Sequence, residues 1–114
     1  MRNTLIVGGA CEGKTKYAKE VLNYSDEHII FPDRDMLIDA MRTRLSIEDL
    51  FFKLTCEKEG WCIIINQVGS GIVPIDREER MYREYVGSFS CLVADKADYV
   101  YRVVCGLAQE IKGK

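Results

Sequence analysis

The sequence predicts an α/β fold with a small, mostly parallel sheet. Short runs rich in β-branched and aromatic residues alternate with longer segments whose apolar residues have helical spacing. A glycine-rich stretch follows the first apolar run, as in a tight turn from a strand into a helix. Hydrophobic residues make up 47% and charged residues 30% of the 114 residues, a balance typical of one folded domain. We therefore expect one domain, residues 1–114, in which helices join parallel strands.

The first half of the chain is predicted to contain two strands and three helices. Pro32 ends the second apolar run, and Ser46 is the expected N-cap of the third helix, with Asp49 three residues on. The expected elements are a strand at 4–7, a helix at 14–24, a strand at 28–31, a helix at 35–44 and a helix that follows Ser46 and ends near Gly60.

The second half of the chain contains the most clearly predicted strand, at residues 61–65, followed by a loop with two glycines and a proline. A long helix is expected at 77–97, although Gly87 weakens its middle. A strand at 99–104 and a short edge strand at 111–112 complete the sheet. Ligands of parallel sheets bind beyond the carboxyl ends of the strands. Here those ends are predicted at Gly8, Pro32 and Asp33, Asn66 and Gln67, and Gly106.

Charge and cysteine content exclude several classes of protein. With 16 basic and 18 acidic residues, the net charge of −2 gives no global electrostatic reason to bind nucleic acid or an anionic membrane. No apolar run approaches the roughly 20 residues that span a bilayer, and no signal peptide is recognisable, so we expect a cytoplasmic protein. The five cysteines lack CxxC spacing and the single histidine, His28, lies far from them. Reduced thiols are therefore expected, without a structural zinc site.

A phosphate-binding motif occupies the turn after the first strand. Residues 8–15 fit the pattern GxxxxGK[ST] at every fixed position, between a predicted strand and a predicted helix. Glycines let the backbone N–H groups approach a polyphosphate, and the helix adds its positive end. Lys14 supplies a charge for the β and γ phosphates, and the Thr15 hydroxyl is a ligand for Mg²⁺. The nucleotide-binding residues are predicted to be Gly8, Gly9, Ala10, Cys11, Glu12, Gly13, Lys14 and Thr15.

Two features of this loop leave alternatives to nucleotide binding open. Glu12 places a carboxylate inside an anion-binding loop, where it repels phosphate unless it points outward. Cys11 lies near a helix N-terminus, where the pKa of a thiol is lowered, so a reactive cysteine is an alternative. The simplest alternative is a glycine-rich turn that binds nothing.

Phosphoryl transfer also needs an acid that holds the metal or its waters. The strand at 61–65 ends in Asn66 and Gln67, which are weaker metal partners than carboxylates. Asp33 is therefore the candidate catalytic acid, with Asp35 as its alternative and a solvated loop as the simpler explanation. Arg80 and Arg83, with Asn66 and Gln67, are candidate contacts to substrate or phosphate. Glutamates interleave with these arginines, which is also typical of a solvated helix face with ion pairs.

The C-terminal half resembles a known family. The stretch at 66–74, NQVGSGIVP, is followed by RMYRE at 80–84, by ADYVY at 97–101 and by VVCG at 103–106. These motifs are similar to those of the adenosylcobinamide kinase / adenosylcobinamide-phosphate guanylyltransferase family of cobalamin biosynthesis, whose phosphate loop also aligns with residues 8–15. The resemblance covers residues 1–31 and 61–114. It implies a P-loop NTPase-like, three-layer α/β sandwich, ATP or GTP with Mg²⁺, a cobinamide-like acceptor, and a homo-oligomer.

The departures from the family pattern are equally informative. Residues 33–60 are interpreted as a short replacement for a longer family segment, which holds the histidine that becomes guanylylated. This chain has no histidine after His28, so guanylyltransferase activity is expected to be absent. The family's glutamate is replaced by Gln67 and its loop serine by Glu12.

Two functions therefore remain open from the sequence. The first is a minimal kinase that passes the γ-phosphate of ATP or GTP to a hydroxyl of a cobinamide-like or other small acceptor. The second is a catalytically degenerate nucleotide-binding regulator or subunit. The position of an acid relative to the Thr15 hydroxyl is expected to separate them.

Overall fold

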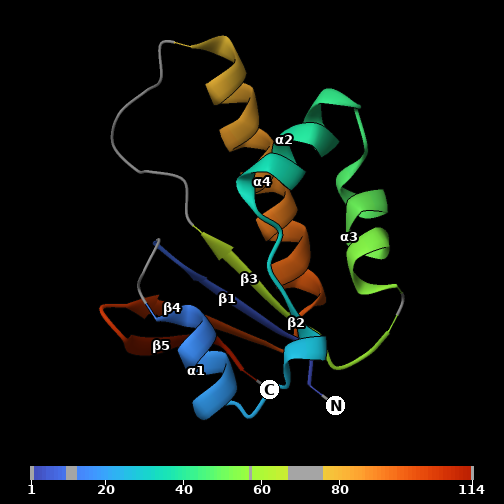
Figure 1. Cartoon of the computed structure of the whole chain (residues 1–114). Coiled ribbons are helices and arrows are strands. Elements are labelled where there is room, and N and C mark those ends of the chain that lie inside the picture. Colours follow the sequence, from blue (N-terminus) through green and yellow to red (C-terminus); the bar gives the residue numbers. More distant parts are fainter. Residues whose placement is uncertain (1, 10–12, 57, 67–75, 114) are drawn as a thin grey trace.

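The computed structural model describes residues 2–9, 13–56, 58–66 and 76–113. Within these ranges five strands form one sheet in the order β2-β3-β1-β4-β5 (Figure 1). The first four strands are parallel, and β5 is antiparallel to β4. The strands are β1 (Thr4–Gly8), β2 (Ile29–Ile30), β3 (Cys62–Asn66), β4 (Tyr99–Val104) and β5 (Leu107–Lys112). The predicted α/β fold with a small, mostly parallel sheet is confirmed, and it is consistent with a P-loop NTPase-like architecture.

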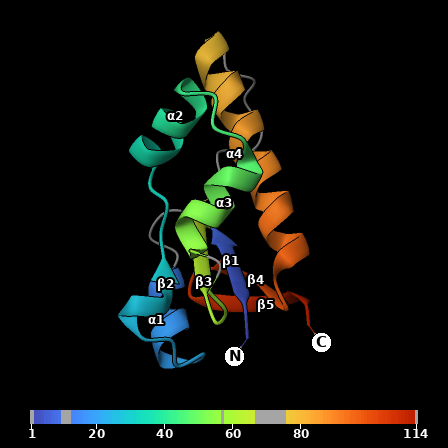
Figure 2. The ribbon, with the colours of Figure 1, turned by 90° about the vertical axis from the view of Figure 1, so that its right-hand side faces the viewer.

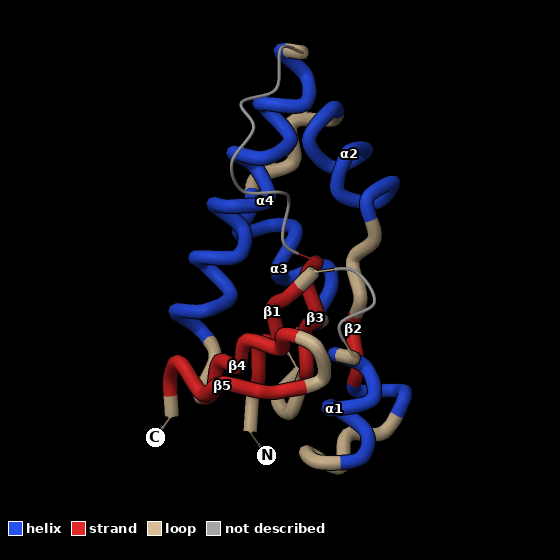
Figure 3. Tube along the Cα trace, turned by 90° about the vertical axis from the view of Figure 1, so that its left-hand side faces the viewer, coloured by secondary structure: helices blue, strands red, loops and turns tan. Residues whose placement is uncertain are grey.

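Helices cover both faces of this sheet and give the predicted three layers. The helical segments are α1 (Lys14–Glu20), the 3₁₀ turn η1 (Asp26–His28), α2 (Arg34–Arg42), α3 (Ile47–Thr55) and α4 (Arg77–Lys96). Figure 3 shows α1 and α4 on opposite sides of the strands. Among the described residues, no helix combines the length and apolar character needed to cross a membrane.

The face beneath α2, α3 and α4 holds the larger core. Alternate strand residues such as Leu5, Ile63 and Ile65 point to this face because successive side chains of a strand point to opposite sides. They pack against Phe89 and Val93 of α4, which are fully buried. Figure 2 shows α3 lying beside α4 over the same face, where the two helices are in contact.

Within the described part of the chain, the opposite face is covered by the short helix α1 and by residues of the segment that follows it, such as Leu22 and Tyr24. Its buried residues are Ile6, Ala18, Cys62, Ile64 and Val103. Burial raises the pKa of the Cys62 thiol to about 12, so this side chain is a neutral apolar group at ordinary pH. This layer is thinner than the one on the α4 side.

Asn3 joins the amino ends of three strands. Its Oδ1 accepts hydrogen bonds from the backbone N–H groups of Gly60, at 2.6 Å, and Trp61, at 3.3 Å. Its backbone N–H donates to the Asp98 carboxylate at 3.1 Å. These contacts link the starts of β1, β3 and β4, which satisfies polar groups that would otherwise be buried without partners.

Several element boundaries differ from the sequence prediction. The helix expected at 14–24 ends at Glu20, and the chain turns back so that the Tyr24 hydroxyl lies 2.8 Å from Thr4 Oγ1. The third helix ends at Thr55, before Cys56 in the left-handed conformation, rather than near Gly60. The strand expected at 28–31 is reduced to β2, and the second helix is α2 (Arg34–Arg42) instead of 35–44. The edge strand predicted at 111–112 extends over all of β5, because pairing with β4 continues to the turn.

Candidate functional site

The candidate site lies where β1 and β3 end side by side. Gly8 and Asn66 are paired residues of these parallel strands. The chain that follows β1 forms α1 on one face, whereas the helix that follows β3 is α4 on the other face. In open α/β folds, ligands usually bind at the carboxyl edge of the sheet, where the helices after two neighbouring strands lie on opposite faces.

Two glycines of the predicted phosphate loop are required by their surroundings. A Cβ added to Gly8 would lie 2.5 Å from the carbonyl oxygen of Val103, a distance that real Cβ atoms essentially never show. Gly13 caps the N-terminus of α1 with φ of 88°, in the left-handed region that favours glycine. Glycine is therefore required at position 8 for a steric reason and favoured at position 13 for a conformational reason.

Lys14 is the first residue of α1 and lies almost wholly buried. Its Nζ donates a hydrogen bond to the carbonyl oxygen of Gly9, so the ammonium group turns back onto the loop. Thr15 follows on the exposed first turn of the helix. Lysine and threonine thus stand at the start of a helix beyond the sheet edge, as the motif predicted. Ala10, Cys11 and Glu12 lie outside the described residues.

The side chains near this edge fit a metal ion that arrives with a polyphosphate. Thr15 offers an exposed hydroxyl, and Asn66 offers a half-buried amide oxygen. No group of three or more histidine, cysteine or acidic side chains within the described ranges could hold a metal. Mg²⁺ commonly takes few protein ligands and completes its shell with phosphates and water. The donor set is therefore compatible with a nucleotide-bound metal, and Gln67 lies outside the described residues.

Asp33 caps the N-terminus of α2. Its Oδ1 accepts a hydrogen bond of 2.8 Å from the backbone N–H of Met36, which makes it the N-cap of this helix. β2, the strand before it, is separated from β1 by β3. Asp33 thus has a structural role that the sequence analysis overlooked, on the far side of β3 from the loop. Asp35 is exposed in the first turn of the same helix.

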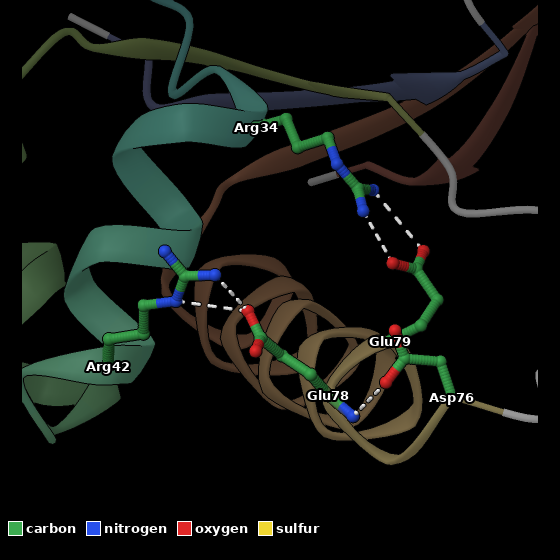
Figure 4. A network of polar contacts seen from close by, with 5 residues as sticks. All are labelled: Arg34, Arg42, Asp76, Glu78 and Glu79. Atoms are coloured by element: carbon green, nitrogen blue, oxygen red, sulfur yellow. Dashed lines mark hydrogen bonds and ion pairs between the residues drawn. The ribbon is translucent and has the colours of Figure 1, made fainter.

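The start of α4 carries arginines and glutamates, and its glutamates lie in a network that the sequence analysis described only in part. Arg80 is exposed and Arg83 is half-buried. The glutamates between them pair with another helix, because Glu78 bonds Arg42 and Glu79 bonds Arg34 of α2 (Figure 4). Glu78 and Glu79 therefore form ion pairs between α4 and α2, which the sequence analysis did not anticipate.

Arg34 is the residue of this network that the sequence analysis missed. Its guanidinium lies 4.5 Å from the ring centroid of Tyr82, in a cation–π contact. The hydrogen bond from Arg34 lowers the pKa of Glu79, and burial raises the pKa of Tyr82. Nothing local in the sequence indicates this pairing, since 45 residues separate Arg34 from Glu79.

Comparison with known proteins identifies one family. The family model described as cobinamide kinase / cobinamide phosphate guanyltransferase matches residues 33–111. The match includes the stretch at 33–60, runs into β5, and leaves the phosphate loop outside. No curated protein matches the chain.

Proposed function

Because the chain belongs to the cobinamide kinase / cobinamide phosphate guanyltransferase family, we propose that it binds ATP or GTP with Mg²⁺ at residues 8–15. The observation that carries the proposal is Lys14, buried at the first turn of α1 with its ammonium group on the carbonyl of Gly9. A polyphosphate oxygen is the natural replacement for that carbonyl, since a charge-assisted hydrogen bond to an anion is stronger.

Each part of the loop has a defined role in this proposal. The glycines bring the backbone close to the phosphates, and the N-terminus of α1 adds favourable partial charge. Lys14 binds the β and γ phosphates, while Thr15 is the protein ligand of the metal. Bound Mg²⁺ supplies neutralisation of charge on the triphosphate. Gly9, Ala10, Cys11 and Glu12 contribute backbone N–H groups.

We further propose that the γ-phosphate passes to a hydroxyl of a cobinamide-like acceptor. In this reaction the oxygen of the acceptor hydroxyl attacks the γ-phosphorus and its proton is released to solvent, while the bond to the β–γ bridging oxygen breaks and ADP or GDP leaves. The proposed contacts to acceptor or phosphate are Asn66, Gln67, Arg80 and Arg83. Asp33 serves the metal through water, using the carboxylate oxygen that does not cap α2.

The chain offers no histidine in a position to become guanylylated. His28 is its single histidine and lies in η1, immediately before β2. That position is at the amino edge of the sheet, opposite the end where Gly8 and Asn66 meet. We therefore propose that only nucleotide binding and the kinase reaction are retained.

One observation favours a second function, nucleotide binding without transfer. Asn66 occupies the end of the strand beside β1, where an acid would be expected to serve the metal. Asp33 is bound to its own helix and lies beyond β3. In this reading the protein is a nucleotide-binding regulator or subunit.

Calorimetry of ATP and GTP, with and without Mg²⁺, tests the binding proposal. Lys14→Ala is expected to weaken binding at least tenfold, since it removes the charge that contacts two phosphates. Lys16→Ala is the matched control, because Lys16 is exposed on the same helix and pairs with Glu20. Equal binding by all three proteins, or none by wild type at millimolar nucleotide, would refute the proposal.

Transfer of radiolabelled γ-phosphate to cobinamide separates the two functions. A labelled product that is lost in Lys14→Ala and reduced in Asp33→Asn supports the kinase. Asp33→Asn is the informative variant because asparagine also caps helices, so the fold is preserved while the charge is removed. Tight nucleotide binding without a labelled product supports the regulator or subunit.

A further inference from the structure

Strand β5 leaves one edge of the sheet open in the part of the chain that the structure describes. It is the last strand in the sheet order, beside β4 alone, and all six of its residues are exposed (Figure 1). The strand at the other edge, β2, has only two residues. An unpaired edge as long as β5 presents a row of backbone N–H and C=O groups that can pair with another strand.

The hairpin of β4 and β5 determines which backbone groups of β5 face outward. Val104 and Leu107 are paired across a two-residue turn, and in such a hairpin the backbone groups of these flanking residues bond each other. Bonding directions alternate along a strand, so the backbone groups of Gln109 also face β4. Those of Ala108 and Glu110 face away from the sheet. These two residues are therefore the ones that a further strand would bond.

The usual protection of an edge strand is weak on β5. Edge strands often carry proline, free charged side chains or a bulge. β5 has no proline, and the side chain of Lys112 is held on α4, because its Nζ donates to the carbonyl oxygens of Ala94 and Asp95 at 3.0 and 3.2 Å. The register shift against β4 falls beyond Glu110, at the far end of the strand. Residues 107–110 therefore form a regular edge.

The exposed apolar residues of β5 lie near its two ends. Leu107 is 77% exposed and Ile111 is 58% exposed. In an antiparallel pair of two copies centred on Gln109, Leu107 of each copy would lie opposite Ile111 of the other. The same register pairs Ala108 with Glu110, so the outward-facing residues of both strands would bond each other. The sequence of β5 is thus complementary to itself.

The neighbouring registers fit this strand less well. A pair centred on Glu110 would place two carboxylates directly opposite each other, which destabilises a sheet. A pair centred on Ala108 would leave Leu107 opposite Gln109, without an apolar partner. A slip by one residue would match outward-facing groups with residues whose groups already bond β4. The register centred on Gln109 therefore has the most favourable contacts.

We propose that β5 pairs with β5 of a second copy of the chain, antiparallel and centred on Gln109, so that the two sheets become one continuous sheet. A two-fold axis relates the copies, the commonest symmetry of protein oligomers. The family resemblance implies an oligomer but assigns no surface to it. Residues 107–111 lie outside the predicted phosphate loop, so this contact does not depend on the proposed function.

Analytical ultracentrifugation over a series of protein concentrations tests the pairing. Ala108→Pro removes an outward N–H and places a proline ring on the open edge, while the bonds to β4 remain, because an edge strand tolerates proline where its N–H faces solvent. We expect a dimer of wild type whose dissociation constant rises about tenfold or more in Ala108→Pro. Ala108→Thr is the matched control, since threonine keeps the N–H and favours strands. It should dimerise as wild type does.

A second variant keeps the test decisive if Ala108→Pro changes the circular dichroism spectrum. Leu107→Lys retains every backbone group of β5 and replaces the apolar contact with Ile111 of the other copy by a charge. It should also weaken the dimer, with an unchanged spectrum, because a lysine opposite isoleucine gains no apolar contact.

Several results would overturn the pairing through β5. One is wild-type protein that stays monomeric up to millimolar concentration. Another is a trimer, since pairing about a two-fold axis gives only even numbers of copies. An oligomer that Leu107→Lys and a correctly folded Ala108→Pro leave intact would use another surface. Equal weakening by Ala108→Thr and Ala108→Pro would assign the effect to the side chain at this position and not to the open edge.

Discussion

The two faces of the sheet differ in the number of buried side chains that pack on them. Among the described residues, fourteen buried side chains form the core under α2, α3 and α4, against five under α1. The thick face includes the aromatic residues Phe51 of α3, Phe89 of α4 and Trp61, which immediately precedes β3. The thin face carries Lys14 and the predicted phosphate loop. Most of the buried apolar core therefore lies on one side of the sheet, and the proposed ligand site on the other.

The thin layer has a physical consequence for the candidate site. Seven residues make α1 too short to be stable without tertiary contacts. Its order depends on Ala18, packed under the sheet, and on the capping geometry of Gly13. A ligand at the loop would add contacts to this helix, so binding should protect α1 more than any element of the thick face.

The largest change in the free energy of unfolding is expected from a cavity made under α4, on the face with the larger core. Phe89→Ala removes a fully buried ring from α4 and should lower the free energy of unfolding by about 3–5 kcal/mol. Urea unfolding followed by circular dichroism measures this change. Ile64→Val, a smaller deletion on the thin face, should lower it by about 0.5–1.5 kcal/mol. Equal losses would contradict the difference between the faces.

A smaller effect is expected at the junction of sheet and loop. Gly8→Ala places a methyl group 2.5 Å from the Val103 carbonyl, so β1 or β4 must shift. Overpacking of this kind should lower the free energy of unfolding by about 1–3 kcal/mol. Nucleotide affinity should fall as well, because the loop starts at this residue. A stable variant that binds normally would show that the two strands separate easily.

Gly87→Ala should have the opposite sign. Gly87 lies in the middle of α4, and a Cβ there meets nothing within 4 Å. Alanine has higher helix propensity than glycine, so the free energy of unfolding should rise by about 0.5–1 kcal/mol. Urea unfolding of Gly8→Ala and Gly87→Ala together compares the same substitution in a crowded and an open position. A loss of stability in Gly87→Ala would mean that another group needs this space.

The smallest effect concerns the ion pair between Glu79 and Arg34. The pKa of Glu79 is lowered by the hydrogen bond from Arg34, so the folded state favours the charged form. The stabilisation is present above the usual glutamate pKa of about 4.3 and is lost as the pH falls through the lowered pKa. Wild type should thus lose more stability than Glu79→Gln between pH 5 and pH 3. The measurement is the midpoint of urea unfolding at low salt. Identical pH profiles would show that the pair contributes nothing.

Local patterns predicted most of the secondary structure. The apolar runs that became β1, β3 and β4 could be recognised because buried parallel strands are continuously hydrophobic. Ser46 was correctly predicted as an N-cap and accepts the hydrogen bond of Asp49 N–H at 3.1 Å. The end of α1 was missed although a local signal marks it. Asn23 has a positive φ of 62°, and the N–H of Tyr24 donates to the Ala18 carbonyl at 3.0 Å, as at many helix C-termini.

The candidate site could be predicted only where its residues are adjacent in sequence. Gly8, Gly13 and Lys14 lie together as the motif indicates, and their roles in binding stay predictions. The pairing of Asn66 with Gly8 depends on strand order, which no local pattern encodes. The N-cap role of Asp33 was missed, although an aspartate that precedes a helical run is a usual N-cap, and its role toward the metal stays a prediction. That signal was present in the sequence.

The central position of β1 also governs how the chain can fold during synthesis. β1 precedes both neighbours in the sequence, and Leu5 pairs with Ile63 on one side and with Val100 on the other. Until those residues have left the ribosome, its apolar side chains have no strand beside them. Closing such long segments is slow, and exposed strand edges aggregate in the meantime. The molecule therefore depends on late synthesis of α4 and β4 to bury the strand that leads to the predicted phosphate loop.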